Sequence, residues 1–88
     1  TRYSPDHPVA RYYLGMESAR AGDHAAAVVH WRRALRSRPD DFATRFNLVI
    51  ALDQSGRREE ARAEATELRR RAPDDARARA LAARLGLP

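Results

Sequence analysis

Cysteine and lysine are both absent from this 88-residue sequence, and aromatic residues are scarce. Without cysteine the chain can form neither disulfides nor thiolate metal sites. Only 7% of the residues are aromatic, against a hydrophobic fraction of 43%, so most apolar side chains are small or aliphatic ones that suit helices. The most apolar run, Leu48 to Leu52, is far shorter than the ~20 residues that span a bilayer, so membrane insertion is not expected.

Every basic residue is an arginine, and the formal net charge is +5. Such a charge can attract nucleic acid or an acidic partner. The twelve acidic residues are interleaved with the arginines, however, and the aromatics that nucleic-acid surfaces use for stacking lie elsewhere in the chain. We therefore do not expect nucleic acid as a partner. The composition is that of a GC-rich coding sequence, which favours a bacterial source.

The sequence repeats itself with a period of 34 residues. A shift by this period superimposes turn glycines, small apolar residues and a Pro-Asp-Asp motif, a combination that chance does not easily produce. The matched positions are Gly22 with Gly56, Ala27 with Ala61, Leu14 with Leu48, Pro39-Asp40-Asp41 with Pro73-Asp74-Asp75, and Arg11 with Arg45 and Arg79. Because Arg79 continues the series, a third copy begins before residue 88. Repeats of this length are typical of stacked helical hairpins.

Helix boundaries follow from proline, glycine and aspartate. Proline suits a first helical position, glycine suits the residue after a helix, and aspartate caps an N-terminus. The first helix is expected to start at Pro8 and end at Gly22, and the second to follow an Asp23 cap and run to about Arg38. The third is capped by Asp40 or Asp41 and closed by Gly56, the fourth runs from about Arg58 to Arg71, and the fifth is capped by Asp74 or Asp75 and ends at Gly86. The short connections between them make neighbouring helices antiparallel.

The joint pattern resembles the tetratricopeptide repeat, a helix–turn–helix unit of the same length. The first copy carries Leu14-Gly15, Gly22, Ala27, Trp31, Ala34 and Pro39, and the second carries Asn47-Leu48, Gly56, Ala61, Leu68 and Pro73. The resemblance implies one all-α domain over residues 1–88, a superhelix of two antiparallel helical hairpins plus a C-terminal capping helix. Repeat one then spans 8–41, repeat two spans 42–75, and the capping helix spans 76–88.

Small residues determine how closely the expected helices approach. Gly15 and Ala27 stand where the first two helices would cross, and Trp31 is expected to fill the seam between the two hairpins. The second copy has Ala65 at the position of Trp31. A closing helix with small residues of its own, such as Ala78, is therefore expected to pack very close.

Catalytic and metal-binding patterns are missing from the sequence. His24 and His30 lie six residues apart, whereas two ligands on one helix face need a spacing of three or four. No glycine-rich phosphate loop is present, and the paired aspartates recur with the repeat, as helix caps would. We expect neither an enzyme nor a cofactor.

In this family the first helix of each repeat lines the concave groove in which a peptide binds. The residues that the resemblance places in this peptide-binding groove are Tyr12, Tyr13, Met16, Phe46, Asn47, Ile50, Arg77 and Arg84. Asn47 matches a carboxylate-clamp asparagine of the family, and Arg77 stands where a clamp lysine is common. The other clamp positions differ, so the full clamp is absent. We expect Asn47 and Arg77 to face each other beside an apolar wall.

Two functions are compatible with such a groove. The first is a non-catalytic module that binds a protein or peptide partner, with apolar anchors and an acidic or C-terminal carboxylate group. The alternative is self-association, in which a homodimer buries the same apolar groove. Light scattering at micromolar concentration would separate the two.

Residues 10–35 also resemble the tetratricopeptide regions of bacterial cytochrome c maturation factors, through Tyr13-Leu14-Gly15, Ala21-Gly22-Asp23-His24 and Trp31-Arg32. That resemblance implies apocytochrome C-termini as ligands in the periplasm. The compartment is otherwise open, with the cytoplasm as the default and the periplasm as the expectation for part of a secreted or membrane-anchored protein.

Overall fold

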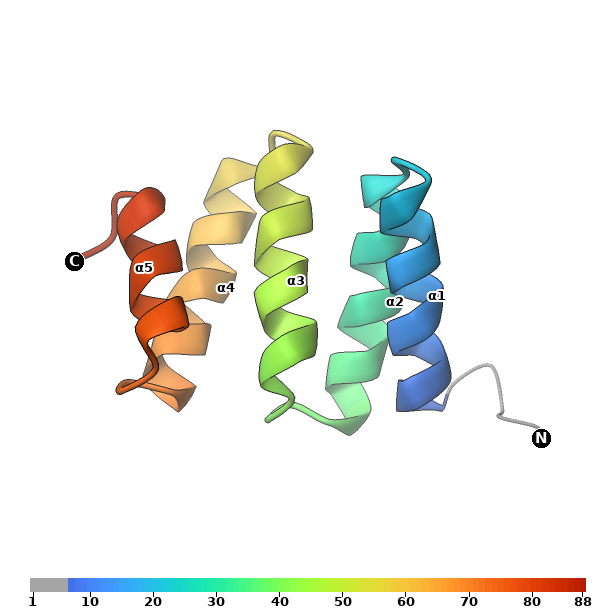
Figure 1. The fold of residues 1–88 in the computed structure, drawn as a ribbon, viewed down its shortest axis with the longest axis horizontal. Coiled ribbons are helices and arrows are strands. Elements are labelled where there is room, and N and C mark those ends of the chain that lie inside the picture. The colour runs from blue at the N-terminus through green and yellow to red at the C-terminus, as the bar shows by residue number, and fades with distance from the viewer. Residues whose placement is uncertain (1–6) are drawn as a thin grey trace.

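A computed structural model describes residues 7–88 as five α-helices in two layers (Figure 1). Helices α1, α3 and α5 form the front layer in this view, and α2 and α4 lie behind them. Their bounds are Pro8–Arg20 for α1, His24–Ser37 for α2, Phe42–Gln54 for α3, Arg58–Arg71 for α4 and Ala76–Arg84 for α5. The all-α architecture of two hairpins and a closing helix is confirmed. The first six residues of the expected domain lie outside the described part.

Aspartates start three of the five helices. Asp23 accepts a hydrogen bond from the backbone of α2, Asp41 does the same for α3, and Asp75 for α5. The second aspartate of each Pro-Asp-Asp motif is thus the cap, because it directly precedes the first helical residue. Helix α1 is instead capped by His7, whose Nδ1 accepts from Val9 N at 3.1 Å. Arg57, before α4, makes no side-chain cap bond.

Glycine and proline end the helices as their backbone chemistry requires. Gly22, Gly56 and Gly86 have φ of +83°, +79° and +76°, the left-handed region that favours glycine. Helices α2 and α4 instead stop just before Pro39 and Pro73. The last helical residue of α5 is Arg84, two residues before its glycine, as in α1 and α3.

The core lies between the layers and depends on alanine. Ala61, Ala65 and Ala78 are completely buried, as are Leu48 and Leu52 on α3. The expectation that α5 packs closely onto α4 through small residues agrees with this burial. Since a hairpin cannot bury both of its apolar faces alone, each one is stabilised by the next element of the stack.

Trp31 packs against α1 inside the first hairpin. The sequence predicts it in the seam between the two hairpins, and it belongs to the buried core that also contains Leu48 and Val49 of α3. Its indole occupies the space over Gly15 where a β-carbon would otherwise stand, and its Nε1 donates to Tyr12 O at 3.1 Å. Only glycine leaves room for a ring at this crossing, so the pair Gly15–Trp31 sets the distance between α1 and α2.

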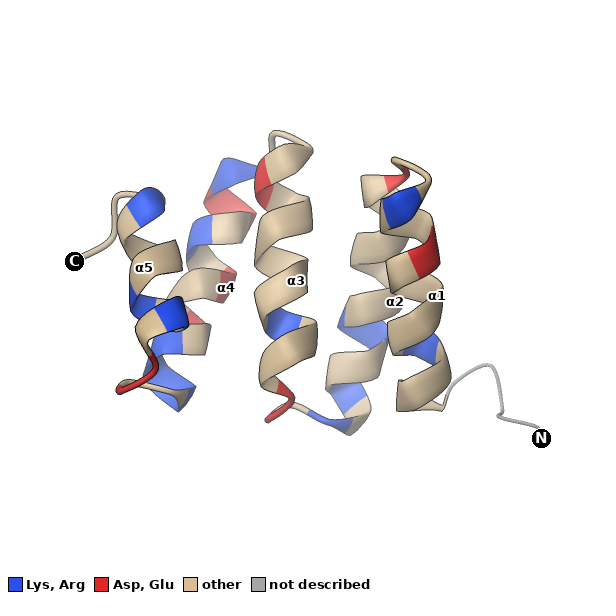
Figure 2. Ribbon diagram, in the orientation of Figure 1, with Lys and Arg blue, Asp and Glu red and all other residues tan. Residues whose placement is uncertain are grey.

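Charged residues are mixed in sign along α4 and sparse along α3 (Figure 2). Ion pairs connect the first repeat with the second, such as Arg32 on α2 with Glu60 on α4 at 2.9 Å, and Arg71 on α4 with Asp40 at 2.6 Å. Exposed pairs of this kind contribute little each, but they offset much of the positive charge locally. None of the described helices is both long and apolar enough to cross a membrane.

Candidate functional site

The expected groove residues of repeats one and two lie on the front layer, on α1 and α3. We call this surface the α1/α3 face; it comprises Tyr12, Tyr13, Met16, Phe46, Asn47 and Ile50. Tyr13 is 62% exposed, a larger fraction than that of the exposed apolar residues Leu14 and Val29. The other apolar members are partly buried and pack against the core. Tyr13 is therefore the residue whose exposure folding leaves unexplained.

Asn47 connects the two helices of the α1/α3 face. Its side-chain amide donates to the Tyr12 hydroxyl at 3.4 Å and to Met16 Sδ at 3.8 Å. Both bonds are long and therefore weak. The amide is held between α1 and α3 but remains able to bind a better acceptor, such as a peptide carbonyl or a carboxylate.

Arg77 lies at the first turn of α5 with partners of its own. Its guanidinium is 2.9 Å from Asp75 Oδ2 and lies 4.4 Å from the centre of the Phe42 ring. The hydrogen bond from Arg77 lowers the pKa of the Asp75 carboxyl. The side chain of Asn47 thus contacts α1, whereas that of Arg77 contacts Phe42 and Asp75. To bind one carboxylate together, both side chains would have to leave these partners. Arg84 is exposed in the last turn of α5.

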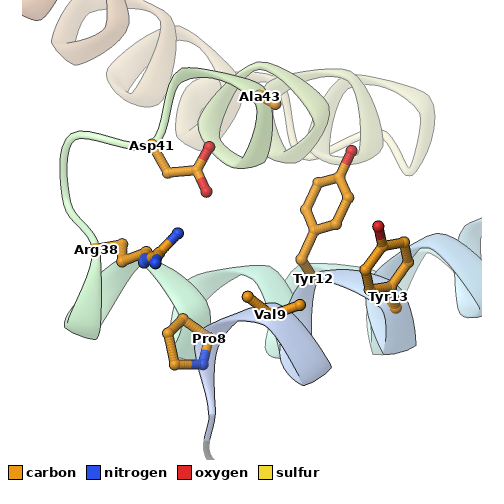
Figure 3. A pocket seen from close by; sticks show the side chains of 7 residues that line it. All are labelled: Pro8, Val9, Tyr12, Tyr13, Arg38, Asp41 and Ala43. Atoms are coloured by element: carbon orange, nitrogen blue, oxygen red, sulfur yellow. The ribbon is translucent and has the colours of Figure 1, made fainter.

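A pocket of about 270 Å³ opens at one end of the α1/α3 face (Figure 3). The ring of Tyr12 forms one side of it, and Arg38 and Asp41, from the connection between α2 and α3, lie on the opposite side. Its lining residues are Pro8, Val9, Tyr12, Tyr13, Arg38, Asp41 and Ala43. Five of these seven were not among the residues expected from the sequence, so the pocket extends the predicted groove toward the N-terminal ends of α1 and α3.

A family model for the tetratricopeptide repeat matches residues 18–85, which is most of the chain. The chain belongs to the tetratricopeptide repeat family. Members of this family generally mediate protein–protein interaction and are typically non-catalytic. No curated protein matches the sequence, and the proposed resemblance of residues 10–35 to cytochrome c maturation factors is not shown by these comparisons.

The tetratricopeptide period explains why the pocket is open. Pro8 precedes Phe42 by one period, and Ala43 precedes Arg77 by one period. Between α3 and α5 the large side chains of Phe42 and Arg77 fill the space beside Phe46, whereas proline and alanine leave the equivalent space empty beside Tyr12. The signal that could have found the pocket is this difference in side-chain size between equivalent positions of the two copies.

Two buried arginines at the same repeat position were not recognised from the sequence. Arg11 is 7% exposed and Arg45 is 8% exposed. The side chain of Arg11 lies 3.0 Å from His30 Nδ1, and Arg45 lies 3.3 Å from Glu64 Oε1 while donating to Pro39 O at 3.0 Å. His30 and Glu64 are themselves one period apart. Each repeat thus joins its two helices through one arginine and one partner on the second helix.

His30 titrates below its ordinary range. Burial lowers the pKa of the His30 imidazole, and the charges of Arg11 and Arg33 lower it further, while Asp23 opposes them. Protonation would place a second cation against Arg11 inside the first hairpin. Among the described residues, no group of histidine, aspartate and glutamate is arranged to hold a metal ion.

Proposed function

We propose that this tetratricopeptide-repeat chain binds a peptide segment of a partner protein on the α1/α3 face. The observation that carries the proposal is the exposure of Tyr13 beside a pocket with mixed walls. Tyrosine presents a large, fairly rigid contact area and a hydroxyl, which is why it is enriched in protein interfaces. Its neighbour Met16 adds a flexible thioether that adapts to different partners.

The polar groups around the face suggest which peptide fits. Asn47 can give its amide to a backbone carbonyl, and the exposed guanidinium groups of Arg77 and Arg84 favour an acidic side chain or a terminal carboxylate. An extended or helical segment with apolar anchors and one such carboxylate would use both kinds of group. Because Asp75 already neutralises part of the Arg77 charge, the carboxylate should add less affinity than the apolar anchors.

The test begins with peptides selected from a random displayed library on the wild-type chain. We expect Tyr13→Ser to weaken the selected peptides about tenfold, since one decade in Kd corresponds to about 1.4 kcal/mol. Val29→Ser is the matched control, because Val29 is a 48% exposed apolar residue on α2, in the other layer. Fluorescence anisotropy measures both. Equal losses in the two variants, or none in Tyr13→Ser, would show that the peptides bind elsewhere.

Self-association is the second candidate, and the same exposed Tyr13 favours it. A dimer that buries the α1/α3 face would hide this side chain and compete with any peptide for it. Light scattering at micromolar concentration reports the mass, and Tyr13→Ser should then shift the chain toward monomer. A wild-type chain that is monomeric throughout this range would leave peptide binding as the function of the face.

A further inference from the structure

The space between α3 and α5 is filled by the chain itself. The ring of Phe42 stacks on that of Phe46, with centroids 5.7 Å apart and planes inclined by 20°. Arg77 lies over the Phe42 ring at 4.4 Å and is paired with Asp75. The order is therefore ring, ring, cation and carboxylate, an arrangement in which each neighbour attracts the next.

The space between α1 and α3 keeps the outer ring and the carboxylate of this arrangement, but neither the inner ring nor the cation is present at its equivalent position. Tyr12 stands one period before Phe46, and Asp41 stands one period before Asp75. Ala43 stands one period before Arg77, and the cation of this space is instead Arg38, which lines the same side of the pocket as Asp41 (Figure 3). The inner ring has no counterpart, because Pro8 replaces Phe42. The volume that the ring would fill is the pocket of about 270 Å³.

We propose that this pocket binds one aromatic side chain of the partner peptide, stacked on Tyr12 beneath Arg38. The bound ring would take the place that Phe42 takes in the next interval, the space between α3 and α5. The inference rests on the proposed peptide-binding function and names the anchor residue of the peptide. It makes the pocket, rather than the α1/α3 face as a whole, the position that selects the sequence of the partner.

The charges in the pocket favour an aromatic ring over other side chains. A cation is attracted to the face of a ring, whose quadrupole is negative there, but gains nothing comparable from an aliphatic chain. An acidic side chain in the pocket would be repelled by Asp41, and a basic one would be repelled by Arg38. A neutral ring with a polarisable face suits both walls.

The probe that tests the pocket directly is N-acetylphenylalanine amide, compared with N-acetylcyclohexylalanine amide, which has a similar shape but no aromatic face. In ¹⁵N-correlated NMR titrations of the wild-type chain, we expect the phenyl compound to shift the amides of Val9 and Ala43 and to bind at least threefold more tightly. In Arg38→Met the two compounds should bind equally. Arg36→Met, which removes an exposed arginine outside the pocket, should keep the preference.

A second variant fills the pocket with the groups that the next interval contains. Pro8→Phe with Ala43→Arg copies Phe42 and Arg77 into the first interval, and we expect it to fold with an unchanged circular dichroism spectrum. It should bind the phenyl compound at least tenfold more weakly. Equal binding of the two compounds by the wild-type chain, or full binding by the filled variant, would overturn the proposal.

The two proposals can fail separately. If the phenyl compound binds as expected while no selected peptide is weakened by Tyr13→Ser, the pocket is real and the larger face is not the peptide site. If peptides depend on Tyr13 but show no preference for an aromatic residue and no loss in the filled variant, the face binds peptides and the aromatic anchor is wrong.

Discussion

Replacing Gly15 by alanine tests the packing of the first hairpin. A β-carbon at this position would stand 2.6 Å from both Cδ1 and Cε2 of Trp31 and would also collide with Nε1. The obstacle is a rigid ring, not the end of a flexible chain, and Trp31 is only 2% exposed. The indole would have to move by about 1 Å for all three of these atoms to reach an ordinary van der Waals distance.

Three contributions determine the size of the effect. Overpacking a closely packed site costs about 1–3 kcal/mol. Moving the indole also weakens the hydrogen bond from Trp31 Nε1 to Tyr12 O, worth about 1 kcal/mol. Against these, alanine is better than glycine inside a helix by about 0.8–1 kcal/mol. The sum is a destabilisation of roughly 1–3 kcal/mol, which lowers the melting temperature by roughly 5–20 °C for a domain of this size.

The measurement is thermal and urea unfolding followed by circular dichroism, carried out as a double-mutant cycle with Trp31→Leu. In the Trp31→Leu background the obstacle is gone, so Gly15→Ala should become neutral or stabilise by up to about 1 kcal/mol, its helix-propensity gain. A wild-type background in which Gly15→Ala raises the melting temperature would show that Trp31 does not lie over Gly15.

Three further predictions concern the same scaffold. Arg45→Ala should reduce the free energy of unfolding by about 1.5–3 kcal/mol, since it removes the ion pair with Glu64 and the charge-assisted hydrogen bond to Pro39 O. Arg79→Ala, at the equivalent but exposed position, should change it by less than about 0.5 kcal/mol. Because the pKa of His30 is lowered on folding, the unfolded chain binds the proton more readily, so stability should fall as the pH drops through the ordinary value of 6.5; His30→Gln should flatten this dependence in urea titrations. Removing α5 and the residues after it should expose the apolar side of α4 and abolish cooperative melting, and a truncated chain with an unaltered transition would show that α5 is not needed as a cap.

Which helices carry the candidate site was expected from the resemblance to the tetratricopeptide repeat. Tyr12, Phe46 and Asn47 are expected on one surface because first helices of successive repeats share a layer, and the fold follows this rule. The contacts of Asn47 and Arg77 could not be predicted, because side chains several Å long choose among neighbours from three helices. The pocket was not predicted, because it is open only where Pro8 and Ala43 are smaller than Phe42 and Arg77, their equivalents one period later.

The sequence by itself determined where each helix starts and stops, since caps, left-handed glycines and prolines act within a few residues of the chain. It also determined the fold class, because a repeated pattern of small and large apolar residues has few ways of being buried. Only the tertiary structure decided that Trp31 belongs to the crossing at Gly15, that Arg45 is buried while Arg79 is exposed, and that the first interval is open. These outcomes depend on volumes and charges brought together from residues a period or more apart, which no local preference specifies.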